Sequence, residues 1–387
     1  MDFIDLKTQQ KRIKSQLDAN IERVLKHGNY IMGPEIKELE KKLAGYVDVK
    51  HAISCASGTD ALLMALMAYG VGPGDAIFTT PFTFIATAEV VGLLGATPIF
   101  VDIDSKTFNI DPEKLALAIK AVQNNDNSIY PLPGIEQAKI KLNPRGIIPV
   151  DLFGLLANYD EIKKIAGENS LFVIEDAAQS FGAEFNNRKS CSFGDISCTS
   201  FFPAKPLGCY GDGGMCFTND DDLASIMESV RVHGKGSDKY DNIRIGINGR
   251  LDTLQAAILL AKFDIFPEEV ELRDKAANFY TQALSGISSL KTPYVPSEYT
   301  SVWAQYSLLA ENEQKRASLQ KKLQEEKIPT AIYYPKPLHL QSAFGYLGYK
   351  KGDFPVSENC AERIFSLPMH PYLTEQDQET IAVNLKG

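Results

Sequence analysis

Short apolar runs alternate with stretches of helix-spaced apolar residues between about residues 50 and 235. The runs that indicate buried strands are 51–57, 76–80, 98–102, 146–151 and 171–174, and the helical stretches include 61–69, 82–94 and 160–165. Apolar runs without polar alternation are typical of strands covered on both faces. Because strands and helices alternate regularly, the pattern predicts an α/β domain with a doubly wound, mainly parallel sheet.

The two ends of the chain have different patterns. Helical spacing of apolar residues predicts helices over 5–26 and 35–46, and an almost continuous helical stretch over 251–282 with a break at 263–267. Beyond residue 286 the predicted elements are strands 302–309 and 330–334 and helices 313–326 and 375–385. We therefore expect a large α/β domain over 1–265 and a smaller α+β domain over 266–387, with the first helix packed on the small domain.

A polar segment rich in Asn and Pro interrupts the α/β pattern at 123–144. It has no clear periodicity, and it is long for a connection inside a compact domain. We expect an inserted loop at this position.

Composition and charge exclude several classes of protein. The chain has 387 residues, 44% of them hydrophobic, a formal net charge of −9 and no block of Lys or Arg. Nucleic acid is not expected as a partner, because phosphate backbones require a clustered positive surface. The amino end lacks the features of a signal peptide and no window of 18 apolar residues occurs, so we expect a cytoplasmic protein without a membrane partner. The six cysteines form no C-x-x-C pair, so neither a metal site nor disulfide bonds are expected.

Candidate chemistry gathers after the apolar run 171–174, where Asp176 follows a predicted strand and Lys205 comes shortly afterwards. Open α/β sheets bind ligands at this carboxyl edge. Lys205 stands among aromatic and proline residues, which exclude water and favour the free amine that forms a Schiff base. Asp176 can stay ionised beside a pyridinium nitrogen and so keep such a ring protonated. A helix-capping Asp and a solvent-facing Lys fit the same two residues in isolation.

A glycine turn provides a second candidate site at Gly58-Thr59-Asp60, between a predicted strand and a predicted helix. Free backbone N–H groups and the helix dipole converge at such a turn and suit an anion. An ordinary βα turn, with Asp60 in the first helical turn, fits the same residues. The segment lacks G-x-G-x-x-G, which disfavours a nicotinamide dehydrogenase.

Two motifs connect these features with a known family. They are Phe172-Val-Ile-Glu-Asp-Ala-Ala-Gln-Ser-Phe-Gly182 and Ser200-Phe-Phe-Pro-Ala-Lys-Pro-Leu-Gly-Cys-Tyr-Gly-Asp-Gly-Gly214. The sequence resembles the StrS/DegT-type sugar aminotransferases over nearly its whole length, from Phe3 to His370. The resemblance implies fold type I with a seven-stranded, mainly parallel sheet, and pyridoxal 5′-phosphate (PLP, alternating with PMP) as cofactor. It also implies that Lys205 forms the Schiff base and that Asp176 pairs with the ring nitrogen.

The resemblance assigns further residues to the cofactor and the sugar. They are Gly58, Thr59 and Ser200 at the phosphate, Asn248 reaching it from the other subunit of a homodimer, Phe84 over the ring, Gln179 near its 3′-oxygen, and Arg250, Tyr333 and Tyr334 around the sugar. Without the resemblance, Phe84 fits a core aromatic, Gln179 an exposed polar residue and Arg250 an interface ion pair. Tyr333 stands where uronate-specific relatives have His, so an imidazolium contact to a carboxylate is missing there.

The implied activity is a ping-pong transfer of an amino group from glutamate, released as 2-oxoglutarate, to a nucleotide-linked keto sugar. The implied sugar is a UDP-linked 2-acetamido-3-oxo-glucuronate used in surface polysaccharide (O-antigen) synthesis. Two alternatives stay open, namely a dTDP- or UDP-linked 3- or 4-keto-6-deoxyhexose as substrate and a PLP-binding regulator without turnover. A PLP sugar dehydratase is disfavoured, because those relatives replace the lysine that is present here as Lys205.

Overall fold

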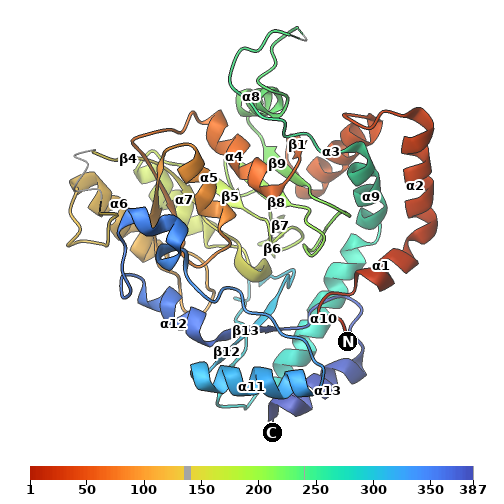
Figure 1. Cartoon of the computed structure of the whole chain (residues 1–387), viewed down its shortest axis with the longest axis vertical. Helices are drawn as coiled ribbons and strands as arrows, with labels where there is room; N and C mark the ends of the chain where they lie inside the picture. Colours follow the sequence, from red (N-terminus) through yellow and green to blue (C-terminus); the bar gives the residue numbers. More distant parts are fainter. Residues whose placement is uncertain (135–140, 239, 387) are drawn as a thin grey trace.

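The computed structural model describes residues 1–134, 141–238 and 240–386, and its largest element is a seven-stranded sheet (Figure 1). In spatial order the strands are β1 (His51–Cys55), β9 (Gly214–Thr218), β8 (Ile196–Ser200), β5 (Phe172–Asp176), β4 (Asn143–Ile148), β2 (Asp75–Thr79) and β3 (Thr97–Phe100). Neighbouring strands from β8 to β3 are parallel, whereas β9 is antiparallel to both β1 and β8. The predicted seven-stranded, mainly parallel sheet is confirmed.

Helices cover both faces of this sheet. On one face lie α4 (Gly58–Ala68), α5 (Ala86–Leu93) and α8 (Asp221–Arg231), and on the other α3 (Pro34–Val47), α6 (Pro112–Asn124), α7 (Tyr159–Glu168) and α9 (Thr253–Phe263). Successive strand residues point to opposite faces, so Ile147 and Val173 join one core cluster while Ile148 and Ile174 join the other. Because β4 and β5 are covered on both faces, 146–148 and 171–174 appear in the sequence as apolar runs without polar alternation.

The carboxyl-terminal part forms a smaller α+β unit, at the bottom of Figure 1. Its antiparallel sheet consists of β10 (Leu290–Lys291), β12 (Tyr306–Ala310) and β13 (Ile364–Leu367), packed with α10 (Phe266–Leu284), α11 (Glu313–Glu325) and α13 (Glu375–Lys386). A third small sheet, β11 (Tyr299–Thr300), β6 (Glu184–Phe185) and β7 (Arg188–Lys189), joins this part of the chain to the large sheet's loops. Because α10 begins at Phe266, we keep 265/266 as the proposed domain boundary.

The amino-terminal helix is interrupted. It consists of α1 (Leu6–Arg12) and α2 (Lys14–His27), which meet at the buried Ile13, where the sequence predicts one helix over 5–26. Gln9 of α1 donates through Nε2 to both carboxylate oxygens of Glu269 on α10, at 3.0 and 2.9 Å. The first helix is therefore tied to the carboxyl-terminal part of the chain.

Other elements begin or end away from their predicted bounds. Helix α4 starts at Gly58, three residues early, because the Ser57 hydroxyl accepts the Asp60 N–H and caps the first turn. Helix α5 starts at Ala86, so Phe82 and Phe84 precede it. The predicted strand 330–334 is a single bridge from Ala331 to Ser366. The described chain also contains helix α12 (Pro355–Arg363) and the short 3-10 turns η2 (Leu152–Gly154), η3 (Leu338–Leu340) and η4 (Ser342–Leu347).

The segment predicted as an inserted loop, 123–144, overlaps the end of α6 and the start of β4. Residues 125–134 and 141–142 belong to no helix or strand, and the predicted loop's residues 135–140 lie outside the described residues. One residue of the described part is anchored, because the Tyr130 hydroxyl accepts the backbone N–H of Asp102 at 2.8 Å.

An arm projects from the large domain beyond α8, at the top of Figure 1. It comprises residues 233–238 and 240–247 and carries exposed apolar side chains, including Ile243 and Ile245. Within the described part of the chain, no helix is long and apolar enough to cross a membrane.

Candidate active site

Asp176 ends the central strand β5 and is almost completely buried. The Thr87 hydroxyl donates to its Oδ2 at 2.7 Å, and the Ala178 N–H donates to Oδ1 at 3.2 Å. These two donors fix the plane of the carboxylate at the carboxyl edge of the sheet. Such an edge is where open α/β proteins place ligands.

Lys205 lies on the loop that joins β8, the strand next to β5, to β9, the strand beyond it. The loop is tight, since the Lys205 N–H donates to the Phe202 carbonyl at 2.9 Å and the Cys209 N–H donates to the Phe201 carbonyl at 2.8 Å. Gly208 has no room for a side chain, because a Cβ there would come within 2.5 Å of the Phe202 carbonyl oxygen. The glycine therefore allows the compact turn that holds the lysine beside Asp176.

Asp176 and Lys205 influence each other's protonation. Burial raises the pKa of Asp176, while the hydrogen bonds from Thr87 and Ala178 and the charge of Lys205 act in the opposite direction. Burial lowers the pKa of Lys205, and the nearby Asp176 partly opposes this. Both shifts favour the neutral forms, so the site has an amine that is easily deprotonated and a carboxyl group that needs a cation to stay ionised.

The glycine turn at the start of α4 meets the end of β8. A Cβ on Gly58 would lie 2.7 Å from the Ser200 Cβ, and a Cβ on Gly214 would lie 2.3 Å from the Ser57 carbonyl oxygen. Ser200 pairs with Gly214 in the sheet register. The backbone N–H groups of Gly58 and Thr59 open the helix and have no intrahelical acceptor. The structure thus brings together three of the residues predicted for an anion site, Gly58, Thr59 and Ser200.

Gln179 and the aromatic residues form the opposite wall. Gln179 accepts the Phe153 N–H through Oε1 at 2.8 Å and donates through Nε2 to the Tyr334 hydroxyl at 3.1 Å. The ring of Phe84 lies 6.4 Å from that of Tyr334 and is 54% exposed, so Phe84 is not a core residue. Tyr333 is half-buried against Phe3.

Asn248 and Arg250 follow the arm and are placed less tightly. Asn248 is exposed, and its backbone bridges to Val232. Between the two, the Gly249 carbonyl accepts the Ala56 N–H at 3.0 Å, close to the glycine turn of the same chain. The Arg250 Nε is buried and has no hydrogen-bond partner among the described residues. The side chain as a whole is only partly buried, so its guanidinium has donors that an acceptor from outside the chain can reach.

Sequence reasoning missed Thr87, Thr83 and Phe153. Thr83 and Thr87 are both buried, and their hydroxyls are 3.2 Å apart, one turn apart in sequence. The only signal in the sequence is a pair of threonines four positions apart at the start of an apolar helix. This spacing is too common to single out the two residues. Among the described residues, no group of three or more His, Cys, Asp or Glu could hold a metal ion.

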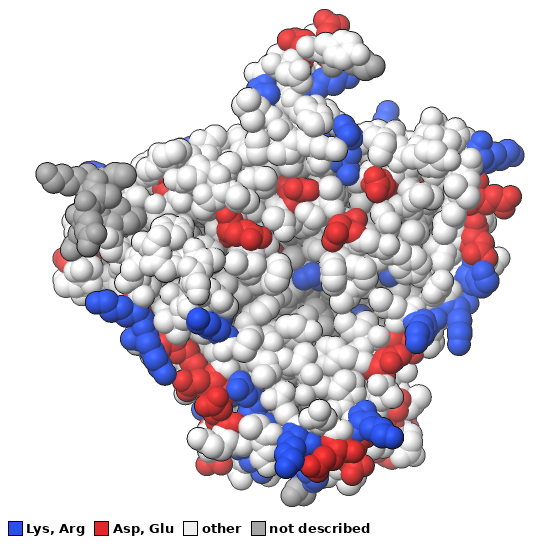
Figure 2. Space-filling view, in the orientation of Figure 1, with Lys and Arg blue, Asp and Glu red and all other residues white. Residues whose placement is uncertain are grey.

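Figure 2 shows a hollow near the middle of one face of the molecule, with acidic side chains above it and a basic side chain on its floor. The strand ends β5 and β8 lie behind the upper part of this face in Figure 1.

Comparison with protein families gives a match over almost the entire chain. A model of the DegT/DnrJ/EryC1/StrS aminotransferase family matches residues 11–386. The match includes the motifs around Asp176 and Lys205 as well as the whole carboxyl-terminal part.

Individual relatives also match this chain over nearly its whole length. The chain is 48% identical to the UDP-2-acetamido-2-deoxy-3-oxo-D-glucuronate aminotransferase of Pseudomonas aeruginosa, with 96% of each chain covered. It is 41% identical to a pleiotropic regulatory protein of Geobacillus stearothermophilus, with 98% of this chain and 96% of that one covered. The crystal structure of a DegT DnrJ EryC1 StrS aminotransferase from Brucella abortus has a TM-score of 0.93 and 51% identity, covering 100% of this chain and 99% of that one.

Proposed function

This chain belongs to the DegT/DnrJ/EryC1/StrS aminotransferase family, whose members depend on PLP, and we propose its substrates from that premise. The proposed reaction moves the amino group of glutamate to C3 of UDP-2-acetamido-2-deoxy-3-oxo-glucuronate, a precursor of surface polysaccharide such as O-antigen. The observation that carries the proposal is the 48% identity, over 96% of both chains, to an enzyme named for that substrate.

The residues present suit the cofactor. The turn at Gly58 and Thr59 offers free N–H groups and the Ser200 hydroxyl to a phosphate, and glycines leave the space that side chains would fill. The exposed Phe84 ring provides a face for a pyridine ring, and Gln179 lies on the same wall, joined to it through Tyr334. When bound, PLP supplies an aldehyde that accepts the amino group and a ring that takes up electrons.

Asp176 and Lys205 are the proposed catalytic residues. The buried Asp176 carboxylate needs a cationic partner to stay ionised, and a protonated ring nitrogen is such a partner. The Lys205 Nζ has a lowered pKa, so it is suited to form the covalent link to the cofactor and, once released, to take a proton from the α-carbon of glutamate. Both side chains are positioned by neighbouring strands, which keeps their separation fixed.

Arg250, Tyr333 and Tyr334 are the proposed sugar contacts. The unpartnered Arg250 Nε suits a uronate carboxylate, because guanidinium groups bind carboxylates through directed, charge-assisted hydrogen bonds. Tyr333 can add a neutral hydrogen bond. The Tyr334 hydroxyl is already held by Gln179, so its position is fixed before the sugar arrives.

We also propose a homodimer with shared active sites. The arm carries exposed apolar side chains, and an exposed apolar surface of this kind marks a protein contact. Asn248 follows the arm and is exposed, so it is available to the cofactor phosphate of a second subunit.

Product analysis tests the substrate. The purified protein is incubated with glutamate and a panel of keto-sugar nucleotides, and the aminated products are identified by mass spectrometry. We expect the 3-oxo-glucuronate to be aminated fastest. Faster amination of a dTDP- or UDP-linked 3- or 4-keto-6-deoxyhexose would replace the proposed substrate, and no amination of any sugar would favour a regulator without turnover, the class named for the relative from Geobacillus stearothermophilus.

A further inference from the structure

A cavity of about 760 Å³ lies between the two domains, apart from the proposed active site. Its walls come from the loop after β3, from β10 with the segment behind it, and from α12. No residue proposed for the cofactor, the sugar or catalysis lines it. Its volume lies within the range of roughly 300–1,000 Å³ that is usual for small-molecule sites.

The cavity is cationic in a chain of net charge −9. Each wall contributes one basic residue, Lys106, Lys291 and Arg363, and among the described residues that line it there is no Asp or Glu. The Arg363 Nε is buried and has no hydrogen-bond partner in the described segments. Three basic residues in the lining, without a lining carboxylate, favour a ligand with two or three negative charges.

The rest of the lining is largely apolar and aromatic. Phe108 and Leu309 are buried in its floor, and Val356 lies beside them. Tyr294 has a ring that is 51% exposed, with the Lys106 Nζ at 5.9 Å from the ring centroid. An exposed aromatic ring beside cations is suited to a flat ring attached to a phosphate.

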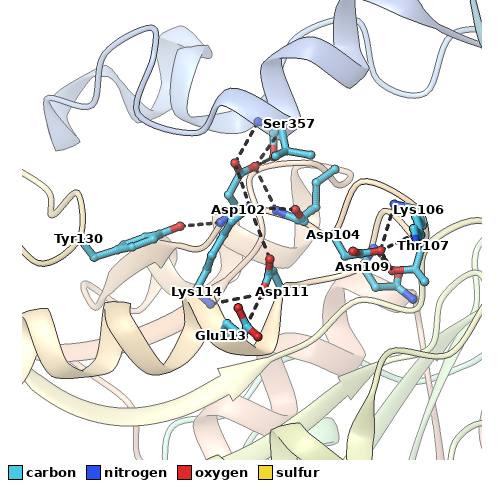
Figure 3. Close-up of polar contacts among 12 residues, drawn as sticks. Asp102, Asp104, Lys106, Thr107, Asn109, Asp111, Glu113, Lys114, Tyr130 and Ser357 are labelled. Carbon is cyan, nitrogen blue, oxygen red and sulfur yellow. Dashed lines mark hydrogen bonds and ion pairs between the residues drawn. The ribbon is translucent and has the colours of Figure 1, made fainter.

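The walls are held by hydrogen bonds of Asp102 and Asp104, which Figure 3 shows. The Asp102 carboxylate, 1% exposed at the end of β3, accepts the N–H groups of Val356 and Ser357 at 3.0 and 2.8 Å and the Ser357 hydroxyl at 2.6 Å. Asp104 accepts the N–H groups of Lys106 and Thr107 at 3.0 and 2.8 Å. The cavity is therefore formed before a ligand binds. Because Asp102 already occupies the amino end of α12, an anion must be bound by the basic side chains.

A second, acid-lined cavity nearby helps to direct an anionic ligand to the basic cavity. It has a volume of about 770 Å³, shares the loop after β3, and is lined by Asp104, Asp111, Glu113 and Glu161. The two cavities have nearly equal size and opposite charge. An anionic ligand is repelled from one and attracted to the other.

We propose that the cavity lined by Lys106, Lys291 and Arg363 binds a nucleoside diphosphate, with the phosphates on the three cations and the base against Tyr294. The ligand contacts both domains, so its binding stabilises their present arrangement. This site is distinct from the catalytic one and does not depend on which keto sugar the enzyme uses.

Calorimetric titration of the PLP-loaded protein with ADP tests the proposal. We expect one ADP per chain at this site, with affinity lowered about tenfold or more in Arg363→Gln and in Lys291→Gln, because each change removes a charge-assisted contact. Lys321→Gln is the matched control, since Lys321 is an exposed lysine of the same domain outside the cavity and its loss should leave the affinity unchanged. Tyr294→Ala should weaken ADP about tenfold while leaving inorganic diphosphate unaffected.

The outcomes separate the two possible locations of bound ADP. Equal ADP affinity in the wild type, Arg363→Gln and Lys291→Gln would place the nucleotide in the catalytic cleft and overturn the proposal. So would the absence of any binding heat at millimolar ADP. Equal PLP absorbance in all variants shows that they are folded, and a rise in melting temperature with ADP that disappears in Arg363→Gln supports the site independently of calorimetry.

Discussion

The inner and outer halves of the proposed active site are built differently. In the inner half, Asp176, Gln179 and Lys205 are each held by hydrogen bonds or a tight turn from within the chain. In the outer half, Asn248 is exposed and the Arg250 Nε is buried without a partner in the part of the chain that the structure describes. The inner half is therefore complete in one chain, whereas the outer half offers groups for molecules that come from outside.

This difference divides the chemistry. Proton transfer needs fixed distances and a water-poor setting, and the inner half supplies both. Recognition of a sugar needs unsatisfied donors, and the outer half supplies them. Substitutions in the inner half should thus affect every substrate alike, and substitutions in the outer half should discriminate between sugars.

The largest effect is expected for Lys205→Ala. Loss of the amine removes the proposed proton carrier, so the rate of both half-reactions should fall on the order of 10⁴-fold. Borohydride reduction of the wild type followed by peptide mapping should place the cofactor on Lys205. Lys336→Ala, at an exposed lysine in the segment after Tyr334, is the control and should keep the label. A label on another lysine would refute the assignment.

The next effect is expected for Arg250→Ala. If Arg250 binds the sugar carboxylate, the uronate is left with an unpaired charge, and kcat/KM for it should fall about a hundredfold. A 6-deoxy sugar lacks that carboxylate, so its kcat/KM and the glutamate half-reaction should change much less. Arg145→Ala, on β4 and outside both the arm and the proposed site, serves as the matched control. An equal loss for both sugars would assign Arg250 to the diphosphate or to the subunit contact.

A smaller effect is expected for Thr87→Val, which removes one hydrogen bond to Asp176. That bond favours the carboxylate and lowers its pKa, so its loss raises the pKa further. Asp176 then takes up a proton at a higher pH, and the acid limb of the kcat/KM profile should move to higher pH, with a loss of about tenfold at neutral pH. Thr87→Ser should restore the wild-type profile. An unchanged acid limb in Thr87→Val would contradict this role.

The smallest effect is a recovery of activity in mixed dimers. Lys205→Ala and Asn248→Ala subunits are each impaired, but a heterodimer has one site with both wild-type residues if the sites are shared. Random mixing should therefore restore about a quarter of wild-type activity. Subunit exchange is checked by native mass spectrometry. Mixed dimers without recovered activity would show that each chain completes its own site.

The sequence was sufficient for the inner half where the signal is local. The apolar run before Asp176 predicts a central strand, so Asp176 could be placed at the carboxyl edge of the sheet. Lys205 could be singled out by the aromatic and proline residues beside it and by the family motif that contains it. Thr87 could not be found, because its contact with Asp176 depends on how α5 lies on the sheet. The predicted helix start at residue 61 is wrong, because Ser57 caps the helix and the glycine turn is itself the first turn of α4.

The outer half could not be derived from one sequence. Whether a guanidinium nitrogen is buried and unpartnered depends on packing from several distant segments, and Arg250 has the same local pattern as an interface ion pair. The predicted strand 330–334 failed for a similar reason. Its Tyr333 and Tyr334 pack against Phe3 and Phe82 and do not pair with a strand.

The antiparallel strand β9 has a consequence for how the chain is made. Strand β1 lies at the sheet edge and pairs only with β9, which is synthesised after most of the large domain. At about 5–20 residues per second, β1 leaves the ribosome on the order of ten seconds before its partner exists. During that interval its apolar Ile53 and Cys55 lack their native cover, and the glycine turn at Gly58 that follows has no Ser200 or Gly214 beside it. A nascent chain therefore acquires its cofactor cradle late, and chaperone binding to this strand should precede cofactor capture.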